Sequence, residues 1–224
     1  MGRIILTLTV FFLFTANLFA FTPPKKLNWG MTYKEAKKHL GKELPKDQRL
    51  KLGKLKDVKG MAGYKSAELK KSKILKKKTY FTALYFDDTG KLGSFLYMFM
   101  WENSEDTRKA EEGFSGYAGK GREECWAFQQ NLVQKLTSKN GEPVVDETID
   151  KRGEIIASKT QYKVQWVDAD TGDEINLILS RSMHKDFVFG ETDRYVLYLS
   201  YANEKMIKAT EAAEEASDAE SDDL

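Results

Sequence analysis

The chain has 224 residues, of which 41% are hydrophobic and 12% aromatic, a composition typical of a packed core and not of a disordered chain. A single cysteine excludes an intramolecular disulfide, so the core must be stable without one. The net charge is only +2, but residues 25–78 carry 19 Lys and Arg against 5 Asp and Glu, residues 81–202 carry 14 against 21, and residues 203–224 carry 2 against 8. Such segregation bears on solubility and encounter partners, and it excludes no fold.

Residues 1–20 have the order of features typical of a secretory signal peptide. Arg3 is followed by the apolar run Ile4–Phe14, broken only by two threonines, and then by a more polar stretch. Cleavage at the end of this segment would start the mature chain at Phe21, and the protein would be exported to the periplasm or the extracellular space. An uncleaved anchor is the alternative, because Leu18 stands where a small residue is preferred. After cleavage we expect no stable membrane span.

The first predicted helix begins at a capping box. Thr32 is followed three residues later by Glu35, so each side chain is placed to satisfy a free backbone N–H of the other residue. Tyr33 and Leu40 then fall on one face, and Gly41 offers a left-handed stop. We therefore expect a helix from about Thr32 to Leu40.

The next clear signal is a β-hairpin. Residues 42–79 show no regular pattern, because lysines and glycines interrupt each apolar run, and we expect a short strand or a turn there at best. Tyr80–Phe86 and Leu92–Trp101 are rich in aromatic and β-favouring residues, and the Asp-Asp-Thr-Gly sequence between them is typical of a turn. The sequence therefore predicts two antiparallel strands joined by this turn.

A long amphipathic helix is predicted next. From about Arg122, apolar residues such as Cys125, Phe128 and Leu132 recur at helical spacing. The helix should end near Asn140, which is followed at once by glycine and, two residues later, by proline. We interpret Cys125 as a small apolar side chain of this helix, in preference to a reactive or dimer-forming thiol.

The C-terminal half is predicted to be an antiparallel meander followed by an acidic tail. Short turn-rich stretches separate four strand-like runs, which favours antiparallel pairing. The four runs are Ile155–Ile156, Tyr162–Val167, Ile175–Leu179 and Tyr195–Tyr201. In the tail, Lys205–Ala216 would form a fraying helix and Ser217–Leu224 would be disordered.

Together these elements predict an α+β fold, an antiparallel sheet with two or three helices packed on one face. Residues 21–202 should form a single domain, and residues 203–224 an acidic, largely disordered tail. The large side chains that this fold should bury are Trp29, Phe86, Trp126, Phe128, Leu132, Leu136, Trp166 and Tyr198.

Four short motifs occur along the chain in a recognisable order. They are the opening Leu27-Asn-Trp-Gly-Met-Thr32, a strand ending in Phe86-Asp-x-x-Gly-Lys-Leu92, a helix closing on Lys139-Asn-Gly-Glu-Pro143, and a strand bearing Trp166. This order resembles a broad group of exported bacterial proteins of unknown function. The implied fold is similar to the helix-on-sheet modules of β-lactamase inhibitory protein and of the small outer-membrane assembly lipoprotein. The chain lacks the lipidated cysteine of that lipoprotein, and the resemblance implies neither named function.

Few residues are available for catalysis or for metal binding. The only histidines are His39 and His184, and with a single cysteine the spacing of a zinc site is absent. No nucleophile elbow, metalloprotease helix or phosphate loop occurs. The alternating acids of Asp168–Glu174 resemble a calcium loop, but the glycine is out of register, which favours a hairpin turn. We therefore predict no catalytic residue, no metal site and no cofactor.

The most unusual feature is a cluster of six lysines within nine residues. Its members are Lys70, Lys71, Lys73, Lys76, Lys77 and Lys78. Their field suits phosphate-bearing lipid head groups, lipopolysaccharide, nucleic acid or an acidic protein, with salt-sensitive and poorly specific binding. A solvated loop, or an edge strand whose lysines prevent edge pairing, is the alternative. The acidic tail has the opposite charge, so we expect it to attract or mask these lysines.

The sequence thus favours an exported, non-catalytic binding or accessory module of the bacterial cell envelope, and it leaves the ligand open. The expected partner is an envelope protein or an anionic envelope component that contacts the lysine cluster. Specific binding of nucleic acid is not expected, because lysine is a point charge and no stacking platform accompanies it. A purely structural domain and an enzyme of unrecognised type are the alternatives.

Overall fold

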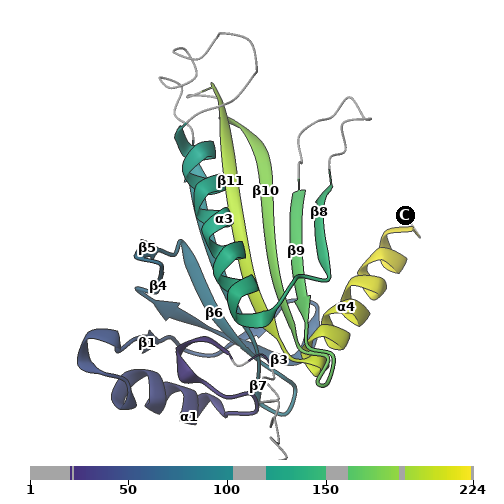
Figure 1. Cartoon of the computed structure of the whole chain (residues 1–224). Helices are drawn as coiled ribbons and strands as arrows, with labels where there is room; N and C mark the ends of the chain where they lie inside the picture. Colours follow the sequence, from purple (N-terminus) through teal and green to yellow (C-terminus); the bar gives the residue numbers. More distant parts are fainter. Residues whose placement is uncertain (1–20, 22, 103–119, 150–160, 187–189, 223–224) are drawn as a thin grey trace, which may run out of the picture.

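The computed structural model describes residues 21, 23–102, 120–149, 161–186 and 190–222 (Figure 1). The signal-like segment 1–20 lies outside these described residues. Within them the chain has the predicted α+β fold, built around a large antiparallel sheet. The fold class predicted from the sequence is therefore confirmed.

The main sheet contains nine strands among the described residues, and a separate two-stranded sheet adds two more. The strands are β1 (Lys51–Leu52), β2 (Lys56–Val58), β3 (Met61–Lys70), β4 (Lys73–Ile74), β5 (Lys77–Lys78), β6 (Phe81–Phe86), β7 (Leu92–Glu102), β8 (Val145–Ile149), β9 (Gln161–Val167), β10 (Glu174–Asp186) and β11 (Gly190–Ala202). The main sheet has the order β1-β3-β6-β7-β11-β10-β9-β8, with β2 paired to β3, and β4 pairs only with β5.

The predicted hairpin is confirmed as strands β6 and β7. Its turn is fixed by Asp87, whose Oδ1 accepts hydrogen bonds from the backbone N–H groups of Thr89 and Lys91 at 3.0 and 2.9 Å. Gly90 has a positive φ of 75°, a conformation that glycine adopts without steric cost. The Asp-Asp-Thr-Gly sequence therefore forms the predicted turn through the side-chain acceptor of Asp87 and the left-handed conformation of Gly90.

The longest strands, β10 and β11, extend well beyond the apolar runs that predict them. They pair over their whole length, from Glu174 opposite Ala202 to Asp186 opposite Gly190. The predicted runs Ile175–Leu179 and Tyr195–Tyr201 have alternate buried side chains. The remaining residues of the two strands are mostly polar, so they produce no regular pattern of apolar residues.

The edge of the sheet formed by β9 and β8 is partly predicted from the sequence. The run Tyr162–Val167 is confirmed as β9, which pairs with β10. Strand β8 directly follows the loop after the long helix, and its five residues are too few and too polar to be recognised. The predicted run Ile155–Ile156 lies outside the described residues.

The lysine-rich segment 42–79 is more regular than its sequence suggests. We expect a short strand or a turn there at best, but β3 has ten residues and pairs with β6 through Lys65–Glu68. Only Ala67 and Leu69 of this strand are buried. The rest of β3 is mostly polar or glycine, apart from Met61 and Ala62 at its start, so the strand has little apolar alternation by which to find it.

The first helix begins as predicted and ends differently. In α1 (Tyr33–Lys38), the Thr32 hydroxyl accepts from the Glu35 N–H at 3.3 Å and the Glu35 carboxylate accepts from the Thr32 N–H at 2.7 Å, which confirms the capping box. Gly41 is not the left-handed stop that we predicted. It lies inside a π-helical turn, η2 (His39–Glu43), in which the Leu44 N–H donates to the His39 carbonyl. Short 3₁₀ turns, η1 (Pro24–Lys26) and η3 (Lys46–Gln48), flank this region.

The long helix α3 (Lys120–Asn140) covers one face of the central sheet (Figure 1). Its buried side chains include Cys125 and Leu132, and the ring of Phe128 lies 4.8 Å from the ring of Phe99 and 5.7 Å from that of Trp101. Alternate residues of β7 point toward this helix, and α1 packs against the same layer through Tyr33 and Phe86. Helices and sheet therefore share one hydrophobic core.

The predicted core is correct in most of its members. Phe86, Leu132, Leu136 and Trp166 are buried, and Trp29 and Phe128 pack against them while partly exposed. Tyr198 is also partly exposed, because it lies on the sheet face opposite α3. Trp126 was expected to be buried but is 46% exposed. Position 126 lies about 100° around the helix from Cys125, so its ring leaves the core stripe and packs beside Tyr162.

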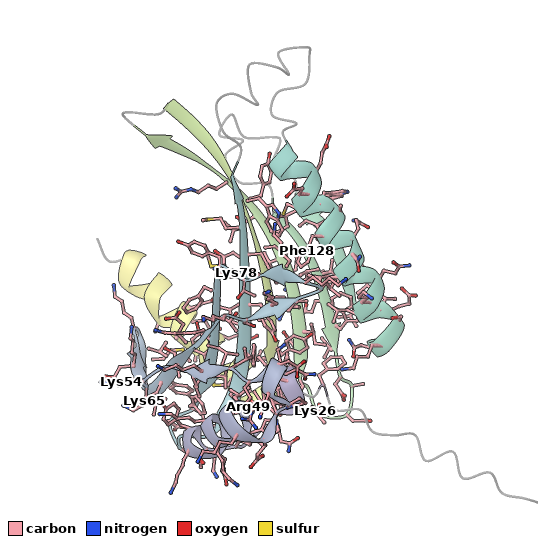
Figure 2. All side chains as sticks on the ribbon, turned by 90° about the vertical axis from the view of Figure 1, so that its left-hand side faces the viewer. Lys26, Arg49, Lys54, Lys65, Lys78 and Phe128 are labelled. Atoms are coloured by element: carbon pink, nitrogen blue, oxygen red, sulfur yellow. The ribbon has the colours of Figure 1, made fainter. Side chains whose placement is uncertain are left out.

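The C-terminal helix α4 (Glu204–Asp222) lies on the opposite side of the sheet from α3 (Figure 2). Its first turn is fixed to the sheet, because Met206 is buried so close to Gly93 that a Cβ there would collide with it. The sequence favours a helix only as far as Ala216, with a largely disordered end to the tail, whereas the structure continues α4 to Asp222. Alanine and glutamate are strong helix formers, and Asn203 caps the helix by accepting from the Met206 N–H at 3.0 Å.

Candidate anion-binding surface

The lysine cluster folds into a small hairpin, β4–β5, whose base is hydrogen-bonded to the body of the protein. The backbone N–H and the hydroxyl of Thr79 both donate to the Ser72 carbonyl at 3.1 Å. The Thr82 hydroxyl, in β6, donates to the Thr79 hydroxyl at 2.9 Å. All three side chains are buried, so the two ends of the hairpin are held together at the edge of the core.

The hairpin has an inner face and an outer face. Ile74 pairs with Lys77, and Ile74 packs against the core. The Lys77 ammonium lies 4.7 Å from the ring centroid of Trp101 and 3.9 Å from a carboxylate oxygen of Glu124 on α3. Lys77 therefore packs the hairpin against the protein, while the other predicted lysines of the cluster have no such contact among the described residues.

The outer face and the tip carry exposed lysines. Lys73 pairs with Lys78 on the outer face, and Lys76 lies in the turn. Lys70, at the end of β3, and Lys71, which follows it, are also exposed. No ion pair within the described part of the chain involves Lys70, Lys71, Lys73, Lys76 or Lys78, which we call the lysine surface.

The lysine surface continues along a basic edge of the sheet. Lys51 pairs with Lys70, and Lys54, Lys56 and Lys59 are exposed on or beside the short strands β1 and β2. In Figure 2, Lys54 and Lys65 lie together at the lower left of the view, and Lys78 lies nearer its centre. Short, lysine-rich outer strands are also the pattern that discourages edge-to-edge pairing, so the alternative interpretation explains β1 and β2 well. It does not explain the hairpin, which forms no outer edge of the main sheet.

The structure also shows what the sequence pattern missed at this surface. The turn residue Leu75 is 39% exposed, and Tyr80, two residues after β5, is 65% exposed. Alternation suggested that Tyr80 belongs to the buried strand, but β6 begins at Phe81. An Ile74-Leu75 pair inside a lysine run without glycine or asparagine was the only sequence signal for an exposed apolar tip.

The two histidines lie in different elements, η2 and β10. His39 Nδ1 lies 2.9 Å from a carboxylate oxygen of Glu43 within η2, and Nε2 lies 3.1 Å from the Lys25 carbonyl, so only Nε2 joins η2 to the preceding segment. His39 borders an open pocket of about 400 Å³ with Trp29, Glu35 and other residues. His184 lies in β10, opposite Thr192 in the strand register.

The charged groups of this pocket are committed to local structure. Hydrogen bonds from the backbone N–H and the side chain of Thr32 hold the pKa of Glu35 below its ordinary value. Lys38 forms an ion pair with Glu43 at 2.9 Å, the same carboxylate that contacts His39. These contacts stabilise the capping box and the π turn.

Cys125 and the acidic turn have structural roles. Burial raises the pKa of the Cys125 thiol to about 12, which fits its interpretation as a small apolar side chain. Asp168–Asp173 forms the turn between β9 and β10, in which Asp168 Oδ1 accepts from the N–H groups of Asp170 and Thr171 at 3.0 Å. The described residues hold no group of three or more His, Cys, Asp or Glu side chains arranged around a metal site.

The chain was also compared with known proteins. No protein family, curated protein or solved structure matches it. The resemblance to exported envelope proteins therefore stays a prediction. Among the described residues, no helix is both long and apolar enough to cross a membrane.

Proposed function

We propose that the protein is an exported, non-catalytic binding or accessory module of the cell envelope that holds an anionic partner through the lysine surface. One observation carries this proposal: five lysines are exposed on and beside a single anchored hairpin, without ion pairs within the described residues. Charges of one sign that are gathered in this way raise the local concentration of a partner with the opposite charge.

The pairing of Lys73 with Lys78 supports a role in binding. Like charges directly opposite each other on neighbouring strands destabilise a hairpin. An anion placed between the two ammonium groups would turn this repulsion into attraction. Because lysine presents a single point charge, the surface would select its partner by charge density and not by planar geometry, and salt would weaken the complex.

The N-terminal end of the described chain supports the export part of the proposal. Phe21, the first residue after the expected cleavage site, is buried in the hydrophobic core with only 7% of its surface exposed. The first residue of the expected mature chain would therefore have a place in the core of the folded domain. Mass spectrometry of the protein from its host tests this point, because the proposal requires an N-terminus near Phe21.

A pair of matched double variants tests the lysine surface. Reversing the hairpin charges with Lys73→Glu and Lys78→Glu should weaken binding to immobilised heparin about tenfold or more at low salt. Reversing Lys54 and Lys59 to Glu changes the net charge equally and should cost clearly less. Equal losses in the two variants would show that only net charge matters and would reject the hairpin as the site. The same conclusion follows if the unmodified protein does not bind.

A further inference from the structure

The tip of the lysine hairpin is apolar. Leu75 is exposed between the outer lysines Lys73 and Lys76, and Tyr80 is exposed shortly after the hairpin. Leu55, which lies between Lys54 and Lys56 on the same basic side, is exposed to a similar extent of 37%, so the hairpin tip is distinguished by its turn and not by exposure alone. The hairpin therefore combines two kinds of surface that a soluble polyanion does not require together.

The residues of the hairpin turn are not those that its backbone conformation usually favours. Leu75 and Lys76 have positive φ angles of 48° and 67°, the pattern of a type I′ turn, in which Asn-Gly is the favoured pair. A leucine and a lysine in left-handed conformation are unfavourable locally. Residues that break a local rule without a visible gain in the fold are candidates for function.

The inner face explains how such a tip is presented. Ile74 packs against the core, and Lys77 contacts Trp101 and Glu124. The hydrogen bonds of Thr79 hold the base of the hairpin. The turn residues therefore project from an anchored support. A contact made by the tip then costs little further ordering of the chain.

We propose that the β4–β5 hairpin docks on the surface of an anionic phospholipid membrane, with Leu75 entering the head-group region and Lys73, Lys76 and Lys78 contacting lipid phosphates. This inference rests on the proposed function and names its anionic partner. Apolar side chains ringed by basic residues are the composition by which peripheral segments bind the membrane interface. Each lysine close to an anionic leaflet strengthens binding by about fivefold, and an inserted leucine adds the burial of apolar surface.

An anionic lipid surface explains the observations better than a soluble polyanion or an acidic protein segment. A phosphate polymer would use the lysines and leave Leu75 in water. A base-stacking partner would require a platform of aromatic rings, whereas Tyr80 alone is exposed at this place among the described residues 70–86. The bilayer interface accepts both the charges and the leucine.

Vesicle binding of full-length variants tests the docking. The partners are vesicles of phosphatidylglycerol and phosphatidylcholine, vesicles of phosphatidylcholine alone, and soluble heparin. Lys76→Gly is the reference, and the double variant Leu75→Asn with Lys76→Gly removes the apolar tip while supplying the favoured I′ pair, so its hairpin should fold at least as well. The two variants carry the same charge. They also share any contribution of the apolar run Ile4–Phe14, so their difference isolates Leu75.

The double variant should bind the anionic vesicles about tenfold less tightly than Lys76→Gly, while the two bind heparin equally. Equal affinity for the vesicles would overturn the docking inference and leave the proposed function standing, provided that heparin is still bound. A parallel loss of heparin affinity would also overturn it, because the tip would then contact a soluble polyanion. If the unmodified protein binds neither partner, both the inference and the proposed function are rejected.

A fluorescent label gives an independent measure of insertion. Leu75→Cys, labelled with an environment-sensitive dye, should shift its emission to the blue on anionic vesicles and remain unchanged on phosphatidylcholine. Cys125 is fully buried, with its thiol pKa raised to about 12, so it should not react. Val167→Cys, at a site of similar exposure on β9, is the matched control and should not shift. No shift at position 75, or an equal shift at 167, would reject insertion of the hairpin tip.

Discussion

The centre of the sheet and its lysine-rich edge are stabilised in different ways. In β7 and β11 alternate residues are large and fully buried beneath α3, as Phe99 and Leu197 are. At the other end, β3 buries only Ala67 and Leu69, and the β4–β5 hairpin is attached through the Thr79 hydrogen bonds, Lys77 and the single apolar residue Ile74. The comparison indicates that the centre supplies the stability of the fold, while the edge is free to carry exposed charge for another purpose.

The largest expected effect of a substitution lies in the centre. Phe99→Ala removes a fully buried ring that contacts Phe128 and Trp101, and it should lower the free energy of unfolding by about 3–5 kcal/mol. Trp126→Ala, which removes a larger ring from the exposed side of α3, should cost less than about 1 kcal/mol. Chemical denaturation measures both. Similar losses for the two variants would contradict the division between core and surface.

A smaller effect is expected where α4 joins the β6–β7 turn. Burial by itself would raise the pKa of Asp87, but hydrogen bonds from Lys205, Thr89 and the Lys91 N–H outweigh it and hold that pKa below its ordinary value. A depressed carboxyl pKa stabilises the fold fully above the unfolded-state pKa, near 3.8, and this contribution disappears as pH falls through the folded-state value. Acidification below about pH 4 should therefore weaken the attachment of α4 to the β6–β7 turn through Lys205 and Asp87.

Asp87→Asn tests this joint. At neutral pH it should cost about 1–2 kcal/mol, because the Lys205 ammonium loses a charged partner at 2.8 Å while the turn keeps an acceptor. Asp88→Asn is the control, since Asp88 also pairs with Lys205 but is exposed, and it should cost less. The difference between Asp87→Asn and the unmodified protein should vanish in acid. A constant difference across pH would show that the carboxylate charge contributes nothing.

The sequence predicts the centre better than the edge for a physical reason. The Thr32–Glu35 capping box, the β6–β7 hairpin and helix α3 are marked by local patterns, and each is confirmed. Strand β3 is held mainly by its neighbours, and tertiary pairing leaves no periodicity in the sequence. The inner position of Lys77 and the exposed position of Leu75 follow from hairpin register, which a run of lysines does not reveal.

The smallest effect is expected from removing residues 209–224. Opposite charge predicted that the acidic tail would mask the lysines, but Figure 1 shows α4 and the β4–β5 hairpin on opposite sides of the molecule. The described ion pairs of α4 join Lys205 to Asp87 and Asp88, and Lys208 to Glu204. At physiological salt, attraction between exposed charges is largely screened beyond about 8 Å, so the tail should hardly affect the hairpin. Truncation should therefore leave heparin affinity within about twofold, with α4 still attached through Met206. A tightening that disappears as salt is raised would restore the masking model, in which the tail competes with the anionic partner for the lysine surface.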